Sequence, residues 1–170
     1  PRTPTADPEG TIRRARANTA IECPSIEVNK TVSFDGTCPG REVTVINEVA
    51  QPVTFCYEIR NTGTTYLDTI RITDTLRTRT ALPRIVYTDT ITFGVDPNLP
   101  IAPGESVQRQ VTIPHLTNDC GIADDEVQVS ANPVNAGRTD LPCLPDVFDD
   151  DRMRIEIPCA GVDFRLQLPI

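Results

Sequence analysis

The feature that most constrains this chain is a strict alternation of apolar and polar residues over 53–60. Val, Phe, Tyr and Ile take every second position, with Thr, Cys, Glu and Arg between them. Because successive side chains of a strand point to opposite faces, this period of two predicts a strand with one face toward a core. Asn61-Thr62-Gly63 follows and is typical of a turn, since Asn and Gly tolerate unusual backbone angles.

Other segments have the same character, and turn residues separate them at the spacing of a β-sandwich. No window shows a sustained period of 3.6 residues, so we expect no substantial helix. Abundant Thr and Pro agree with β structure, since Thr favours strands and Pro punctuates loops. The predicted fold class is all-β, an antiparallel β-sandwich with strands near 26–34, 43–46, 53–60, 66–75, 84–93, 106–114 and 125–133.

The chain divides into three regions. Residues 1–22 form a polar, Pro-rich and then basic arm, which cannot bury enough apolar surface to order itself alone. Residues 23–157 form the sandwich, within which we expect 134–151 to be a loop before a last strand. Residues 158–170 alternate apolar and polar side chains, so we expect an extra C-terminal strand or tail.

Charge and hydropathy argue against nucleic-acid binding and against a membrane-spanning segment. The net charge is −8, with fifteen Arg but a single Lys, Lys30. Nucleic-acid binding needs a basic footprint, so we expect no nucleic-acid partner. No apolar run approaches the roughly 18 residues of a membrane span, so we expect no such span.

The six cysteines predict disulfides formed in an oxidising, extracellular compartment. None lies in a C-x-x-C motif and the chain has one His, so we expect no zinc site. Six cysteines allow 15 pairings. We expect Cys38 to pair with Cys56 across a hairpin, and the remaining bonds to be Cys120 with Cys143 and Cys23 with Cys159.

Four segments in order resemble the conserved-repeat, immunoglobulin-like domain of microbial and algal cell-surface proteins, a family of unknown function. They are IEVNKTVS, PVTFCYEIRNTGTTYLDTIRITDT, IAPGESVQRQVTI and VQVSANPV, and the similarity runs from about residue 26 to 151. The resemblance implies an immunoglobulin-like sandwich without a catalytic site. It also implies that Asn61-Thr62-Gly63 has a structural role. Members are tandem modules of adhesive or structural surface chains, whereas this chain holds a single copy.

Two features suggest ligands or modification. Asn29-Lys30-Thr31 is the one N-x-[ST] sequon, so Asn29 is a candidate for a glycan. Asp146, Asp149 and Asp151 could supply oxygen ligands to calcium, and Asp124-Asp125-Glu126 is a weaker candidate. Neither spacing is that of an EF-hand, and consecutive Asp residues in a turn are usually solvated, so we expect no metal or other cofactor.

No residue pattern selects an enzyme. His115 lies near a strand end without a convincing nucleophile, so it forms no recognisable triad. No Asp or Glu pair stands out for glycosidase chemistry. We therefore expect a protein without catalytic residues.

Charge polarity predicts self-assembly. Arginines gather in 1–20 and acids in 140–156, which suits head-to-tail contact and an open filament. Open sheet edges are templates for an added strand, so we expect the arm to add to, or insert into, a neighbouring copy. The alternative is a surface adhesin or carbohydrate-binding module, although aromatic residues are only 5%. The expected interface residues are Ile12, Arg13, Arg14, Arg16, Ile21, Asp149, Asp150 and Asp151.

Overall fold

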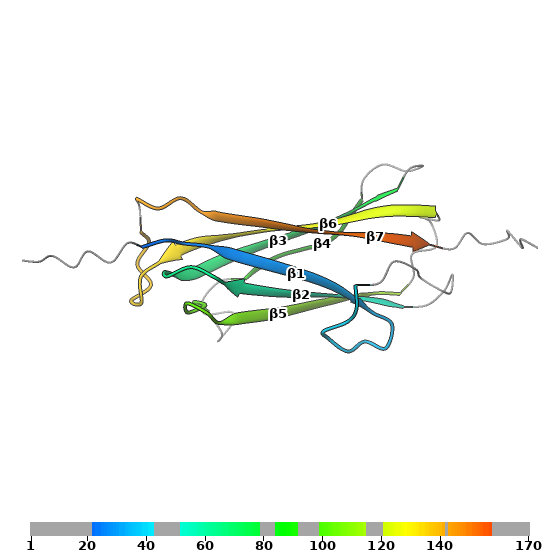
Figure 1. Cartoon of the computed structure of the whole chain (residues 1–170), viewed down its shortest axis with the longest axis horizontal. Coiled ribbons are helices and arrows are strands. Elements are labelled where there is room, and N and C mark those ends of the chain that lie inside the picture. The colour runs from blue at the N-terminus through cyan, green and yellow to red at the C-terminus, as the bar shows by residue number, and fades with distance from the viewer. Residues whose placement is uncertain are drawn as a thin grey trace, which may run out of the picture.

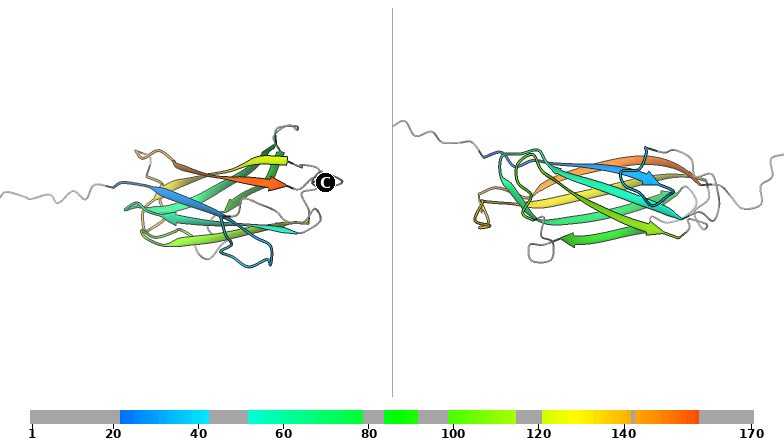
Figure 2. Two further views of the ribbon diagram at one scale, coloured as in Figure 1. Left: turned by 45° about the vertical axis from the view of Figure 1, so that its right-hand side comes forward. Right: turned by 90° about the horizontal axis from the view of Figure 1, so that it is seen from below.

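A computed structural model describes residues 22–42, 52–78, 84–91, 99–114, 121–141 and 143–157, which form two antiparallel sheets (Figures 1 and 2). The three-stranded sheet has the order β1-β2-β5, with β1 at Ile26–Ser33, β2 at Val53–Asn61 and β5 at Ser106–Ile113. The four-stranded sheet has the order β4-β3-β6-β7, with β4 at Arg84–Ile91, β3 at Tyr66–Thr78, β6 at Gly121–Val134 and β7 at Val147–Ile157.

The predicted antiparallel β-sandwich is confirmed. The described ranges contain no helix, and so none that is long and apolar enough to cross a bilayer. β4 pairs with β3, in the sheet where a variable-type immunoglobulin domain has its additional strands, whereas a constant-type domain has its fourth strand in the other sheet. The immunoglobulin-like assignment is finer than the sandwich architecture and stays a prediction.

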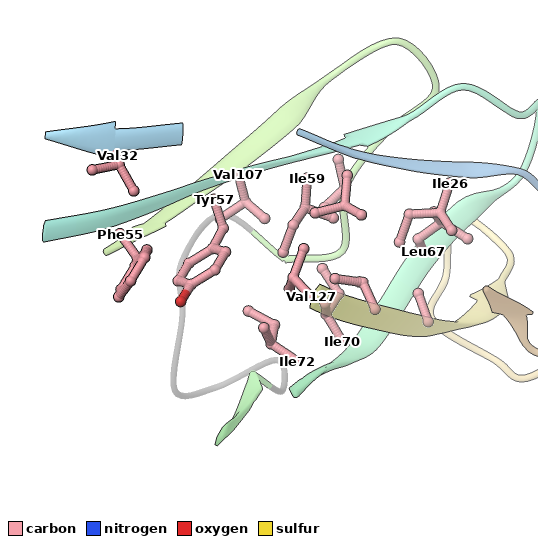
Figure 3. Close-up of a cluster of buried hydrophobic side chains, with 14 of the residues drawn as sticks. Ile26, Val32, Phe55, Tyr57, Ile59, Leu67, Ile70, Ile72, Val107 and Val127 are labelled. Carbon is pink, nitrogen blue, oxygen red and sulfur yellow. The ribbon is translucent and has the colours of Figure 1, made fainter. Parts of the chain in front are cut away.

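The core lies where the inward faces of the two sheets meet. The apolar residues at alternate positions of β2 are buried against alternate residues of β3 and β6, as the sequence predicts (Figure 3). Thr54 and Cys56, on the other face of β2, are buried as well. Phe55, Tyr57 and Ile59 are almost completely buried, as are Ile70 and Ile72 on the facing sheet. Burial of this apolar surface is the main contribution to folding free energy.

The sequence prediction is wrong at β7. Residues 134–151 were expected to form a loop, but β6 continues to Val134 and β7 already begins at Val147. Asp149, Asp150 and Asp151 therefore lie within a strand and not in a turn. Aspartate disfavours strands, but two of these carboxylates accept backbone hydrogen bonds from β1. The predicted strand at 43–46 lies outside the described residues.

Asn61-Thr62-Gly63 anchors the chain segment that enters β1. Asn61 is buried, and its side-chain amide donates hydrogen bonds to the carbonyl oxygens of Thr65 (2.7 Å) and Ile101 (2.9 Å). A Cβ on Gly63 would lie 2.4 Å from the nitrogen of Ser25. Close packing, and not an unusual backbone angle, thus requires glycine here.

We predict that Gly63→Ala destabilises the fold by about 1–3 kcal/mol, because the added methyl group overpacks the segment entering β1. Gly137→Ala is the matched control, since the nearest atom to its Cβ would be 3.3 Å away. Urea unfolding of both variants checks this, and equal midpoints would contradict it.

Candidate functional site

A cluster of charged side chains lies inside the sandwich, between the two sheets. Lys30 of β1 reaches Asp74 of β3 and Asp125 of β6, and the side chains of all three are 0% exposed. The Lys30 Nζ lies 2.6 Å from Oδ1 and 2.7 Å from Oδ2 of Asp74, and it also contacts Oδ2 of Asp125. The Tyr57 hydroxyl donates a hydrogen bond to Oδ2 of Asp74. One ammonium group thus bridges the sheets.

Aromatic rings surround this cluster and exclude water from it. The Lys30 Nζ lies 4.6 Å from the centre of the Phe55 ring and 5.8 Å from that of Tyr57. The Tyr57 ring stacks on Tyr87 of β4, with 5.4 Å between ring centres (Figure 3 shows Phe55 and Tyr57). Cation–π attraction favours the ammonium group in such a setting, and the low local dielectric strengthens each charge interaction.

Burial sets the protonation of the cluster. It raises the pKa of Asp125 to about 7, helped by the charge of Asp74 and opposed by Lys30. Burial and the Asp74 charge also raise the pKa of the Tyr57 hydroxyl. Oδ1 of Asp125 has no hydrogen-bond partner within the described residues. Since its folded pKa exceeds the ordinary 3.8, ionisation of Asp125 weakens folding increasingly as pH rises from about 4 to about 7.

The sequence interpretation missed this cluster, although the alternation contains the signal. In each of three strands, a charged residue occupies a position where the period of two calls for an apolar one. The sequence predicts Asp125 only as a weak calcium ligand, and Lys30 and Asp74 only as parts of sequence motifs. The three inward-facing series are Ile26-Val28-Lys30-Val32, Ile70-Ile72-Asp74-Leu76 and Ala123-Asp125-Val127-Val129.

The outer edge of β1 is closed by hydrogen bonds. The backbone N–H of Val28 donates to Oδ2 of Asp149 (2.8 Å), and that of Lys30 donates to Oδ2 of Asp151 (2.7 Å). The N–H of Val32 donates to the carbonyl oxygen of Arg41 (2.9 Å). β1 and β7 lie side by side as a result (Figure 1). Three successive edge amides of β1 are therefore occupied.

The loop after β1 is joined to the outer face of the three-stranded sheet at Cys56 and to the end of β1 at Val32. Cys38 and Cys56 form the predicted disulfide, with 5.8 Å between their Cα atoms. A Cβ on Gly40 would lie 2.2 Å from the carbonyl oxygen of Val32, so the loop lies directly on β1.

The other cysteine pairings stay predictions. Cys23 and Cys143 are exposed, and neither is bonded to another described cysteine. Their expected partners, Cys159 and Cys120, lie outside the described residues.

The remaining predicted site residues are dispersed. Asn29 is exposed on the outer face of β1. Asp146 pairs with Arg71 at 3.6 Å and Asp150 with Arg152 at 3.3 Å. The described part of the chain holds no group of three or more side chains placed to bind a metal ion. His115 and the arm residues Ile12, Arg13, Arg14, Arg16 and Ile21 lie outside it.

β4 and β5 form the opposite side of the sandwich. Among the described strands, β5 has only β2 as a neighbour, and β4 has only β3. Arg109 of β5 and Asp89 of β4 form an ion pair across this side, with 3.8 Å between Nε and Oδ2. Val86 and Tyr87 of β4, and Val111 and Ile113 of β5, are only partly buried against the core. Ile85 of β4 is 62% exposed.

Comparison with known proteins identifies no family. No family model and no curated protein matches this chain. A putative ApaA protein from Bordetella pertussis is similar at 12% identity and a TM-score of 0.41, covering 83% of this chain and 97% of that one.

Two β-glucosidases are similar at the same low level. The enzyme from Erythrobacter marinus has 13% identity and a TM-score of 0.38, covering 78% of this chain and 15% of the enzyme. That from Listeria innocua has 9% identity and a TM-score of 0.40, covering 80% of this chain and 16% of the enzyme. These likenesses carry no functional information.

We predict that Lys30→Met destabilises the protein by about 3–5 kcal/mol, because it leaves two buried carboxylates without a cation. Replacing all three charges, in Lys30→Met/Asp74→Asn/Asp125→Asn, should recover part of this loss. Urea unfolding measures both effects, and a Lys30→Met variant as stable as the original chain would contradict the prediction.

We also predict that Asp149→Ala/Asp151→Ala exposes the edge of β1. Each change removes an acceptor, so the amide hydrogens of Val28 and Lys30 should exchange about tenfold to a hundredfold faster. Asp150→Ala is the control, because Asp150 is exposed and points away from β1. Hydrogen exchange followed by NMR tests this, and equal rates in both variants would exclude edge capping by these carboxylates.

Proposed function

We propose that this chain is a structural subunit of an extracellular, self-assembling filament. In this proposal, the N-terminal segment of one copy adds as a strand to the open β4/β5 side of the next. The observation that supports it is the asymmetry of the two sandwich sides, since β1 is capped at three amides while β4 and β5 each lack a second neighbouring strand among those described.

An open strand edge favours pairing with another chain, because it presents a row of backbone donors and acceptors. The partly buried side chains of Val86, Tyr87, Val111 and Ile113 would be covered by an added strand. Residues 11–21 hold three arginines, at positions 13, 14 and 16, among small apolar and polar side chains, and the net charge of −8 attracts a basic segment.

The acidic residues of β7 contribute less to this contact than the sequence suggests. Asp149 and Asp151 already accept hydrogen bonds from β1, and Asp150 pairs with Arg152. The proposed contact therefore relies on the strand edge and not on these three carboxylates.

An extracellular location fits the surface chemistry. The Cys38–Cys56 disulfide is of a kind that forms in oxidising compartments. Asn29 is exposed within its sequon, so we propose that it carries a glycan.

Negative-stain microscopy of the full chain and of a variant lacking residues 1–20, both without reducing agent, tests the assembly. We expect fibres from the first and folded monomers from the second. Fibres from the shortened chain would exclude the arm as the link, and monomers from both would exclude the filament.

A point variant tests the side that receives the strand. Ile85→Lys places a charge on the edge strand β4. Charged side chains on edge strands prevent pairing with other strands in natural proteins, so this variant should form no fibres. Phe148→Lys is the matched control, because Phe148 is 74% exposed but lies on β7 at the closed side. Loss of fibres in the control alone would place the contact on β7 instead.

A further inference from the structure

We propose that Lys30 and Asp74 condense to form an intramolecular amide (isopeptide) bond between the two sheets, with Asp125 carrying the protons. This self-catalysed modification is independent of the filament proposal, since it requires only the folded chain. Three groups of complementary chemistry lie together here without exposure to solvent: an amine nitrogen, a carboxyl carbon and a second carboxyl group.

The geometry brings the reacting atoms together. Nζ of Lys30 lies 2.6 Å and 2.7 Å from the two oxygens of Asp74, so it faces the carboxyl carbon between them. When two reacting groups are held about 3 Å apart in a fixed orientation, their reaction is intramolecular. Its rate then corresponds to an effective concentration far above any that free reactants can have in solution. Lys30 and Asp74 come from strands of different sheets, so the folded core itself holds them in place.

Tyr57 and Asp125 have the positions that the reaction needs. The Tyr57 hydroxyl donates to Oδ2 of Asp74, which is where negative charge develops when nitrogen adds to the carbon. Asp125 contacts Nζ through Oδ2, and its Oδ1 accepts no hydrogen bond from any described residue. Its pKa of about 7 lets it hold or release a proton near neutral pH.

The step balances without a co-reactant. The lone pair of Nζ forms the bond to the Asp74 carboxyl carbon, and the bond from that carbon to Oδ1 breaks with its electron pair on oxygen. An ammonium nitrogen gives up two protons, which Asp125 passes in turn to Oδ1, so that one water leaves. Asp125 ends in its starting state, and the amide keeps one proton on nitrogen.

Burial favours the product over the ion pair. A charged pair in a water-free core carries a desolvation cost that its mutual attraction only partly offsets. The amide is neutral and needs only ordinary hydrogen bonds. Tyr57 can donate to its carbonyl oxygen, and the carboxyl group of Asp125 can accept a hydrogen bond from its N–H.

The first test is the intact mass of the full chain, produced in bacteria without glycans and then reduced and alkylated. We expect a protein one water lighter than its sequence requires. The full sequence mass would overturn the proposal.

Peptide mapping identifies the linked residues, because the candidate partners fall in different tryptic peptides. Trypsin should not cleave after Lys30, and peptide 17–41 should be joined to peptide 72–77, which contains Asp74. Cleavage after Lys30 would overturn the bond. A link from 17–41 to 110–138, which contains Asp125, would overturn the assignment of Asp74 as acceptor.

Variants test the roles of the residues. Lys30→Arg and Asp74→Ala remove a reacting group, and Asp125→Asn removes the proton carrier while keeping the shape of the side chain, so all three should have their full sequence mass. Asp124→Asn is the control, because Asp124 is exposed beside Asp125, and it should remain one water lighter. Thermal unfolding verifies that each variant folds, and a water-lighter Asp125→Asn protein would overturn the role of Asp125.

Discussion

Lys30 reaches from the three-stranded sheet to two carboxylates of the four-stranded sheet, and the register of β1, β3 and β6 depends on this contact. A slip of one residue in β1 would turn its ammonium group to solvent and leave Asp74 and Asp125 buried without a cation. The same slip would move the amides of Val28 and Lys30 away from Asp149 and Asp151. Any other alignment of the two sheets would leave a buried charge without its partner, so these charges favour one alignment. Apolar packing alone would favour that alignment less strongly.

The sequence predicts the strands better than it predicts the site. The alternation over 53–60 identifies β2 and its buried face, and the spacing of Cys38 and Cys56 identifies their disulfide. The assignment of β7 fails because strand propensity is a local property, whereas the acceptors in β7 serve amides of a strand about 120 residues earlier. The cluster around Lys30 is missed for a related reason: each strand pattern is local, whereas Lys30, Asp74 and Asp125 meet only where the two sheets pack together.

The two sides of the sandwich differ in how far their strand edges are protected from pairing with another strand. At the β1/β7 side, carboxylates and the Arg41 carbonyl occupy the edge amides, so pairing with another strand would require these bonds to break. At the β4/β5 side, one ion pair between Arg109 and Asp89 spans the gap, and the apolar residues beneath it are only partly covered. An added strand would therefore meet less resistance at β4/β5, and the difference follows from side chains and not from the sandwich architecture.

A covalent link at Lys30 would also change how the domain carries force. In a filament held through its N-terminal segment, tension enters at β1, whose backbone pairs with β2 alone among the described strands and which β7 holds only through the carboxylates of Asp149 and Asp151. The Cys38–Cys56 disulfide connects the loop after β1 to β2, within the same sheet. A bond from Lys30 to Asp74 would instead carry the load to β3, in the other sheet, so that β1 could not be pulled away while the covalent bonds held. The bond would join the strand that receives the tension to the other sheet. At this position a single covalent link opposes the removal of β1 from the sandwich most directly.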